Sequence, residues 1–482
     1  MFNRSRTNKK LLPNFKEKDE ENKIGKVRKD SLDASKPLRL GGLMLHWNII
    51  IVSTIVWFLT VNHYENSVVR RAMNKCSWNT WEQWPEGVKS HKVALYADPQ
   101  ILDEYSYPGR PQIVNYFTRV IVDHYHYRNW RYSQHYLNPD TNFFLGDLFD
   151  GGRHWDDDVW LAEYNRFNKI FPKSPMTKTV FSLPGNHDIG FGDTVIESSL
   201  DRFTTYFGDT SSSHEIGNHT FVLLDTISLS DTTNVNVSSI PKRFLEEFSL
   251  SRRQKSHPNP TILLTHVPLW RNANQQQCGK ERESTKPFPI QKGYQYQTVI
   301  DQTMTQEILT QLTPKFVFSG DDHDYCHVKH TYGANDLGGN NNADHVNSNK
   351  IVDEITVKSC AMNMGIKKPA IQLVSLFNDE SVTGNEPVTT IQTRICYLPD
   401  PFKPMWVYIL LLIGNLGSFI IYIKRYAFVP SLKNDLPLPV STDTTTHKKD
   451  IKVRQLVIDT SANAAITFLL ILVIFSYYYN SI

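Results

Sequence analysis

Three long apolar segments divide the chain. They cover residues 41–61, 404–423 and 461–479. Each is close in length to the roughly 20 residues that a membrane-spanning helix needs. The last two carry no charged side chain and lack the polar face of a helix at a globular surface, which argues against buried core helices. The pattern predicts three transmembrane helices. The first reads as an uncleaved anchor, because no small-residue cleavage site accompanies it.

Between the first two apolar segments, in residues 62–403, short apolar runs alternate with amphipathic stretches. Alternation of strand and helix is typical of an α/β protein whose functional side chains lie on loops at strand ends. We expect a β-sandwich flanked by helices, with polar insertions at 272–296 and 333–349. The expected strands are 91–97, 141–145, 179–183, 219–225, 261–265, 315–318, 354–358, 370–377 and 389–398, and the expected helices are 111–128, 156–170, 197–207, 241–253 and 302–312.

Basic residues flank the apolar segments unequally. Residues 1–40, which are polar and are expected to be a disordered tail, and the loop 424–460 are both rich in lysine and arginine. The positive-inside rule places these two segments in the cytosol and residues 62–403 in a lumen. Two N-x-[ST] sequons, at Asn218 and Asn236, lie in that lumenal part, as N-glycosylation would require.

Composition narrows the functional classes. A formal net charge of +3 on 482 residues gives no case for a nucleic-acid partner. No two cysteines have the C-x-x-C spacing of a zinc ribbon. In an oxidising lumen the five cysteines would allow two disulfides and one free thiol, with the pairing left open. They all lie between the first and second apolar segments, at Cys76, Cys278, Cys326, Cys360 and Cys396.

Residue types that bind metals recur where the predicted strands end. Taken singly, an aspartate after a strand is usually a turn or cap residue, and a histidine is usually a hydrogen-bonded surface or core residue. Recurrence in order along the chain instead predicts a hydrolytic site with two divalent metals that share a carboxylate. The residues are Asp98, Gln100, Asp147, Asn186, His187, His266, Asp321 and His323.

Two of these stretches carry specific motifs. Residues 146–150 read G-D-L-F-D and residues 185–188 read G-N-H-D. In this order, and with the flanking aspartates and histidines, they resemble the calcineurin-like metallophosphoesterase superfamily over roughly residues 91–330. The resemblance implies a metallophosphoesterase-type β-sandwich that binds two divalent metals. It implies Asp98, Gln100, Asp147 and His323 as ligands of one metal, and Asp147, Asn186, His266 and Asp321 as ligands of the other, with Asp147 as the bridge.

The same resemblance implies a catalytic role for His187. This histidine would contact the phosphoryl group and protonate the leaving oxygen, and Asp188 or Asp150 would orient it. Arg110 and Arg153 follow glycine-containing turns and are candidates to bind phosphate, with surface arginines as the alternative.

The sequence departs from the family pattern at two positions. Gln100 stands where the family has a histidine, and Asp321 replaces an imidazole in the usual G-H-x-H motif. Both changes make the donor set richer in oxygen, which favours Mn²⁺ or Mg²⁺ over Zn²⁺. We therefore expect two divalent ions, with Mn²⁺ preferred.

A closer resemblance is to the membrane-bound phosphoesterases that remodel GPI anchors. It implies an ER or Golgi membrane enzyme that removes an ethanolamine-phosphate branch from a mannose of the GPI glycan, with GPI-anchored proteins or GPI lipid as substrate. The fungal cell-division-control branch of that group, which the D-D-H-D-Y-C motif and the three segments favour, would imply the first mannose. The stretches that carry this resemblance are residues 97–100, 107–110, 146–153 and 319–326.

The two departures also motivate an alternative of another class. A catalytically weak metal-binding membrane protein could act in cargo sorting or metal-ion homeostasis. The motif residues Asp147, Asn186 and His187 favour the enzyme, because a relic site has little need to keep both the bridge and the acid.

Overall fold

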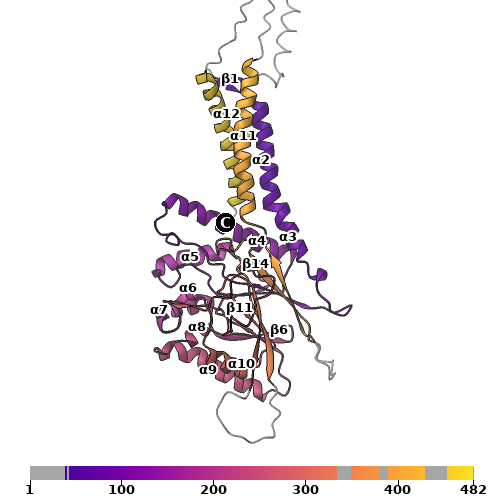
Figure 1. The fold of residues 1–482 in the computed structure, drawn as a ribbon, viewed down its shortest axis with the longest axis vertical. Coiled ribbons are helices and arrows are strands. Elements are labelled where there is room, and N and C mark those ends of the chain that lie inside the picture. Colours follow the sequence, from indigo (N-terminus) through magenta and orange to yellow (C-terminus); the bar gives the residue numbers. More distant parts are fainter. Residues whose placement is uncertain (1–37, 41–42, 334–348, 379–388, 429–452, 481–482) are drawn as a thin grey trace, which may run out of the picture. The chain divides into compact units, whose positions relative to one another are not determined.

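The computed structural model describes residues 38–40, 43–333, 349–378, 389–428 and 453–480 (Figure 1). Its contacts divide the chain into two compact units. One comprises Met1–Thr60 with Ile409–Phe475, and the other comprises Val61–Tyr408 with Ser476–Ile482. The second unit contains every residue that the sequence nominates for the metal site.

Within the described ranges, three helices are long and apolar enough to cross a membrane, at Trp47–Lys75, Phe402–Arg425 and Val453–Tyr479. They coincide with the three apolar segments of the sequence. The first consists of α2 (Trp47–Asn62), a π-helical segment (His63–Val68) and α3 (Val69–Lys75), and the others are α11 (Phe402–Phe428) and α12 (Val453–Tyr479).

The first helix begins later and ends later than expected. It begins at Trp47 rather than at residue 41, because β2 (Leu43–Leu45) pairs antiparallel with β1 (Leu38–Leu40). It continues to Lys75. The polar extension is stable in a helix because its buried Glu65 has ionic partners on another helix.

The third helix begins at Val453 rather than at residue 461. Two of its polar residues have partners at the start of the chain. The side chains of Asp459 and Asn463 accept hydrogen bonds from the backbone N–H groups of Met44 and His46, at 3.0 and 2.8 Å.

The second unit contains two mixed sheets, ordered β12-β13-β11-β8-β7-β6 and β15-β14-β3-β4-β5. Strands β3, β4 and β5 run parallel in one sheet, and β7, β8, β11 and β13 run parallel in the other. The bounds are β3 His91–Tyr96, β4 Thr141–Phe144, β5 Lys178–Val180, β6 Ser212–Ile216, β7 His219–Leu223, β8 Thr261–Leu264, β11 Phe316–Ser319, β12 Cys326–Tyr332, β13 Lys350–Thr356, β14 Ala370–Leu376 and β15 Ile391–Tyr397.

The two sheets pack face to face, as the predicted sandwich requires. Successive residues of a strand point to opposite faces of the sheet. On β4, Phe143 joins the core between the sheets and Phe144 joins the core on the outer side. The same alternation holds at Val93 and Ala94 on β3. The strands are therefore buried on both faces and read as continuous apolar runs.

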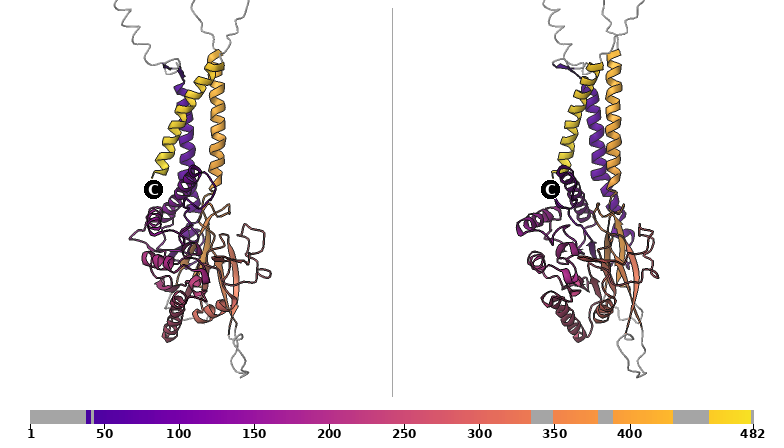
Figure 2. Two further views of the ribbon diagram at one scale, coloured as in Figure 1. Left: turned by 90° about the vertical axis from the view of Figure 1, so that its left-hand side faces the viewer. Right: turned by 60° about the vertical axis from the view of Figure 1, so that its left-hand side comes forward.

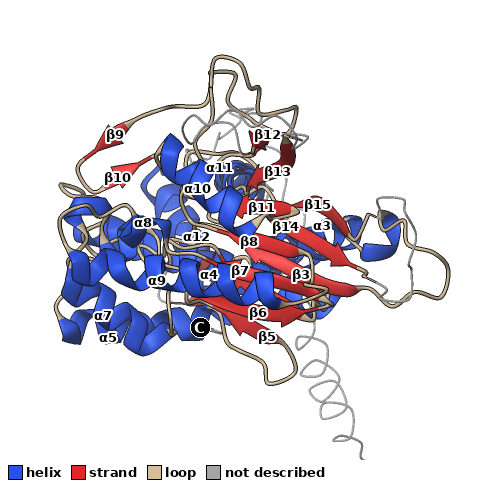
Figure 3. Ribbon diagram, turned by 90° about the horizontal axis from the view of Figure 1, so that it is seen from below, coloured by secondary structure: helices blue, strands red, loops and turns tan. Residues whose placement is uncertain are grey.

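Helices cover the outer faces of the sheets. Their buried side chains, such as Trp130, Phe167 and Leu309, lie in the same cluster as the outer residues of the strands. Figures 2 and 3 show most of the helices gathered beside the strands of this unit. The bounds are α4 Gln112–Tyr136, α5 Asp157–Ile170, α6 Asn186–Ile189, α7 Glu197–Phe207, α8 Thr226–Leu229, α9 Val235–Gln254 and α10 Gln302–Leu312.

Several elements depart from the expected ranges, among them the short helices α6 and α8, which were not expected. Strands β6 and β12 were not expected, because their sequences, SSHEI and CHVKHTY, hold few large apolar residues. Helix α9 begins at Val235, where the side chain of Asn234 accepts the N–H of Asn236, rather than at residue 241.

Both insertions were expected to be irregular. The insertion 272–296 has only the two-residue strand β9 (Lys292–Gly293) and the start of β10 (Tyr296–Gln297). The insertion 333–349 lies almost wholly outside the described residues, as does the expected disordered tail.

Two disulfides join distant parts of the second unit, Cys76 to Cys396 and Cys278 to Cys326. Cys360 is a buried free thiol. The five cysteines therefore form two bridges and leave one thiol, and the structure supplies the pairing that the sequence left open.

Candidate metal centre

The carboxyl ends of parallel strands from both sheets meet at one edge of the sandwich. Strand β3 leads to Asp98 and Gln100, and β4 leads to Asp147. Strand β5 leads to Asn186 at the start of α6, β8 leads to His266, and β11 leads to Asp321 and His323. The order of ligand types along the sequence thus becomes a cluster in space.

His266 lies at the centre of this cluster. Its Nδ1 donates to the carbonyl oxygen of Leu145 at 2.6 Å, so Nε2 is the nitrogen that is free of a proton and can bind a metal. Nε2 lies 3.5 Å from Oδ1 of Asp147, 3.5 Å from Oδ1 of Asp321 and 3.4 Å from Oδ1 of Asn186. Asp98, Asp147 and His266 each offer a ligand atom within 4.8 Å of the others.

The electrostatics of this cluster suit a bound cation. Burial raises the pKa of the Asp98 carboxyl well above its usual value, and the negative charges of Asp147 and Asp321 add to this rise. Burial alone would lower the pKa of His266, but Asp147, Asp321 and Asp98 raise it well above its ordinary value. Three carboxylates thus compete for positive charge at one buried point, and a divalent cation supplies such charge without a proton.

Two orphaned oxygens support the same conclusion. Oδ2 of Asp98 and Oε1 of Gln100 are buried and have no hydrogen-bond partner among the residues that the structure describes. A buried acceptor without a partner is costly, so each such group needs an explanation. The donor set of carboxylates, amide oxygens and imidazoles fits hard divalent cations, and the orphaned oxygens are available to them.

The backbone is strained where the expected ligands lie. Positive φ angles occur at Asp98 (48°), Gln100 (38°), Asp147 (49°), Asp321 (68°) and His323 (63°). Such conformations are uncommon outside glycine and concentrate at functional sites. The surrounding sandwich holds these turns in place.

Two glycines make the close packing possible. A Cβ on Gly185 would lie 2.1 Å from Oδ1 of Asp147, and a Cβ on Gly146, whose φ is +90°, would lie 2.5 Å from Nδ1 of His266. Any side chain at either position would displace an expected ligand, which explains glycine at the start of both motifs.

His187 lies beside this cluster, and Asp150 is the aspartate that faces it. The backbone N–H of His187 donates to Oδ1 of Asp147 at 2.8 Å. Its Nδ1 lies 2.6 Å from the carbonyl oxygen of Asp150, which can only accept, and 3.4 Å from Oδ1 of the Asp150 carboxylate. Nδ1 therefore carries a proton, and Nε2 carries one only in the imidazolium form.

Asp188 was one of two candidates to orient His187, but its carboxylate binds backbone N–H groups instead. Its carboxylate accepts the backbone N–H groups of Leu148, Phe149 and Gly185, at 3.1, 3.1 and 2.8 Å. Burial and the charge of Asp147 raise its pKa to about 7. Asp188 thus ties the two motif loops together, and Asp150 is the carboxylate beside the His187 ring.

The insertion 272–296 contributes a residue that sequence reasoning missed. The carbonyl oxygen of Gln295 accepts Nδ2 of Asn186 at 3.2 Å, which orients the amide so that its Oδ1 faces His266. Oε1 of Gln295 accepts Nε of Arg153 at 3.0 Å, and Arg153 also donates to the carbonyl oxygen of Asn186. Gln295 has a positive φ of 59°, and no pattern in the sequence predicts this backbone conformation.

Arg110 and Asp322 have surroundings other than those expected of metal or phosphate binding, and the two sequons are exposed. Arg110 lines a separate pocket, and none of the expected ligands within the described ranges lines it. Asp322, next to Asp321, forms an ion pair with Arg282. Asn218 and Asn236 are both exposed, and their glycosylation stays a prediction.

These features are those of a metal-dependent hydrolase of phosphate esters. The family model "Calcineurin-like phosphoesterase" matches residues 91–325, which span all the expected ligands. The chain belongs to the calcineurin-like phosphoesterase family, and it is a metal-dependent phosphoesterase.

Particular relatives extend the similarity over the whole chain. Cell division control protein 1 of Saccharomyces cerevisiae is 53% identical over 468 residues, which cover 91% of this chain and 92% of that protein. Metallophosphoesterase 1 of Gallus gallus is 29% identical, covering 42% of this chain and 54% of its own length. The Caenorhabditis elegans Metallophosphoesterase 1 homolog is 27% identical and covers 61% and 73%.

Among solved structures, a phosphopantetheinyl hydrolase from Mycobacterium tuberculosis covers 56% of this chain and 90% of its own, at 11% identity. The TM-score of this match is 0.28.

Proposed function

We propose that this phosphoesterase is a dinuclear-metal phosphodiesterase that removes ethanolamine phosphate from a mannose, the first one, of the GPI anchor. The observation that carries the hydrolytic part is the cluster around Nε2 of His266, in which Asp147, Asp321 and Asn186 present oxygens within 3.5 Å. The substrate is inferred from the resemblance of the motifs to GPI-remodelling phosphoesterases.

The ligand sets implied by the motifs suit two metals. Asp98, Gln100, Asp147 and His323 would hold one, and Asp147, Asn186, His266 and Asp321 would hold the other. The oxygen-rich donors favour Mn²⁺. Such ions supply Lewis acidity, which activates water and offsets charge on a phosphoryl group.

His187 would supply the proton for the leaving oxygen. Because its Nδ1 is bonded to the carbonyl oxygen of Asp150, only the imidazolium has a proton at Nε2. The Asp150 carboxylate, 3.4 Å from Nδ1, would stabilise that cation. Arg153, fixed by Asn186 and Gln295, would place positive charge beside the phosphoryl oxygens.

The membrane and the lumen enter the proposal through other features. Three apolar helices suit an enzyme whose substrate is anchored in a bilayer. The two disulfides favour an oxidising compartment, in accord with a lumenal orientation in the ER or Golgi.

The first test is turnover by the full-length chain in detergent. We expect it to hydrolyse an aryl phosphodiester with Mn²⁺, and we expect Asp147→Ala to be inactive. Absence of turnover with every divalent metal tried would refute the catalytic proposal. It would favour the alternative of a catalytically weak metal-binding membrane protein.

The second test concerns the substrate. Mass spectrometry of GPI glycans from cells that lack this chain should show an extra ethanolamine phosphate on the first mannose, removed by wild type and not by Asp147→Ala. Unchanged glycans would refute the GPI assignment and leave phosphodiester hydrolysis intact.

A further inference from the structure

One face of α4 contacts the ends of two of the apolar helices, and the third packs on the first of them. Nε2 of His124 lies 2.7 Å from Oε2 of Glu65 in the first helix, and its ring stacks on Tyr479 of α12 with centroids 3.8 Å apart. The ring of Tyr64 lies 6.0 Å from that of Tyr408 in α11. All five residues belong to the second compact unit. The position at which the apolar helices join that unit therefore follows from contacts within it.

The same face of α4 continues toward its N-terminus as exposed apolar side chains. Ile113 and Phe117 lie about three and about two helical turns before His124, which places them on one stripe with it. Ile113 is 66% exposed and Phe117 is 56% exposed, and Val114 and Tyr116 beside them are exposed too. A contiguous exposed apolar group on a helix marks an interaction surface.

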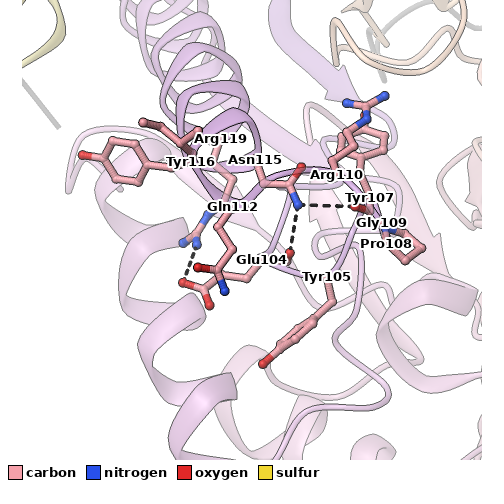
Figure 4. A pocket seen from close by; sticks show the side chains of 11 residues that line it. Glu104, Tyr105, Tyr107, Pro108, Gly109, Arg110, Gln112, Asn115, Tyr116 and Arg119 are labelled. Atoms are coloured by element: carbon pink, nitrogen blue, oxygen red, sulfur yellow. Dashed lines mark hydrogen bonds and ion pairs between the residues drawn. The ribbon is translucent and has the colours of Figure 1, made fainter.

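A pocket of about 550 Å³ opens beside this stripe (Figure 4). Tyr105, Tyr116 and Arg110 line it, and the Arg110 guanidinium lies 3.9 Å from the centroid of the Tyr107 ring. Figure 4 shows Tyr116 and Arg110 projecting from opposite sides of the pocket. Tyrosine and arginine next to apolar residues are the composition of a membrane–water interface.

We propose that the first two turns of α4 dock on the lipid bilayer that anchors the three apolar helices. Ile113 and Phe117 enter the boundary between headgroups and acyl chains, and Arg110 lies at the level of the lipid phosphates. The bilayer is the occupant because the stripe is continuous with the face on which the anchor helices end. Docking also fixes the loop that connects Asp98 and Gln100 to α4, and so holds the metal centre at a set height above the membrane.

The direct test measures depth in the bilayer. Full-length Phe117→Cys carries an environment-sensitive NBD fluorophore in phosphatidylcholine–phosphatidylserine liposomes. Leu250→Cys on α9, where the native side chain is 58% exposed, is the matched control. Unsubstituted chain measures labelling of the buried Cys360. With acyl-brominated lipids, we expect about a twofold loss of NBD intensity at position 117 and none at 250. Equal quenching at both positions, or none at 117, would overturn the proposal, and none at 117 would direct attention to a protein partner.

A functional test rests on the proposed phosphodiesterase activity. The double variant Ile113→Ser/Phe117→Ser should turn over a bilayer-embedded phosphodiester roughly tenfold more slowly, because two apolar contacts with lipid are lost. Hydrolysis of a water-soluble phosphodiester should be unchanged. Equal rates on the embedded substrate would contradict docking. If wild type hydrolyses neither substrate, the proposed function fails while the fluorescence result still decides the docking.

Discussion

The candidate metal centre is built from two segments of different kinds, which are held in place in different ways. Its floor consists of turns at the ends of parallel strands, which carry Asp98, Asp147 and His266. Its side consists of the insertion 272–296, which brings Gln295 against Asn186 and Arg153. The floor is fixed by sheet hydrogen bonds and a double core, whereas the insertion is held to the rest of the domain by a disulfide, ion pairs and side-chain hydrogen bonds. The floor should therefore govern whether metal binds, and the insertion should govern how well the ligands are aligned.

The largest expected effect comes from breaking the floor. Asp147→Ala removes the carboxylate that accepts the His187 N–H and faces His266. We expect about a thousandfold loss of phosphodiesterase activity, and a fall in bound Mn²⁺ that elemental analysis measures. Asp158→Asn, at an exposed position on α5, is the control and should match wild type. Full metal content in Asp147→Ala would contradict its place among the ligands.

A smaller effect is expected where the floor joins the insertion. The carboxylate of Glu354 on β13 lies 2.8 Å from Arg271 and accepts the N–H of Leu269, just before the insertion begins. His330 and Ser319 also bond to it. Glu354→Gln leaves the buried Arg271 without its counter-charge, so the free energy of unfolding should fall by about 3–5 kcal/mol in urea titrations.

The same residue gives a pH signature. Burial would raise the pKa of Glu354, but Arg271, His330 and Ser319 together hold it at about 2, against 4.5 ordinarily. Because the folded state holds the proton less tightly, this stabilisation is complete above pH 4.5 and is lost as pH falls toward 2. Wild type should lose stability through that window more steeply than Glu354→Gln. Parallel curves would refute the assignment.

The sequence predicted the floor far better than the insertion, for a physical reason. Short runs such as 141–145 that are bounded by turn residues are predicted to be strands, and a motif that directly follows a strand lies at the sheet edge by chain connectivity. The α/β sandwich and the gathering of the nominated residues at one edge of it could therefore be predicted from the sequence alone. The contact between Gln295 and Asn186 spans 109 residues and depends on a positive φ at a glutamine, which no local pattern signals.

The choice between Asp150 and Asp188 shows the same limit at shorter range. Each of the two residues is the last of a specific motif, so the sequence could not say which of them faces His187. The carboxylate of Asp188 accepts three backbone N–H groups, whereas the carboxylate of Asp150 lies beside the imidazole ring of His187. The decisive contacts are with backbone amides, whose direction a sequence does not specify.

Removing a disulfide should separate the insertion from the floor. Cys278 lies in the insertion and Cys326 begins β12, close in sequence to His323. Cys278→Ser/Cys326→Ser should lower the free energy of unfolding by about 2–4 kcal/mol and also reduce kcat. The matched pair Cys76→Ser/Cys396→Ser should lower stability by a similar amount with kcat unchanged, since that bridge touches neither part of the site. Equal loss of kcat in both pairs would mean that the insertion has no particular role.

The finest test addresses alignment alone. Gln295→Ala keeps the backbone carbonyl that orients Asn186 but removes the side-chain bonds to Arg153 and to the Thr194 carbonyl. Without the first bond the guanidinium gains freedom, and we expect kcat to fall about tenfold with bound Mn²⁺ unchanged.

Gln277→Ala, at an exposed position in the same insertion, controls for general loosening and should keep wild-type kcat. A loss of metal in Gln295→Ala would show that the insertion helps to bind the ions and would erase the proposed distinction between floor and insertion. A normal kcat would show that Arg153 is positioned by Asn186 alone.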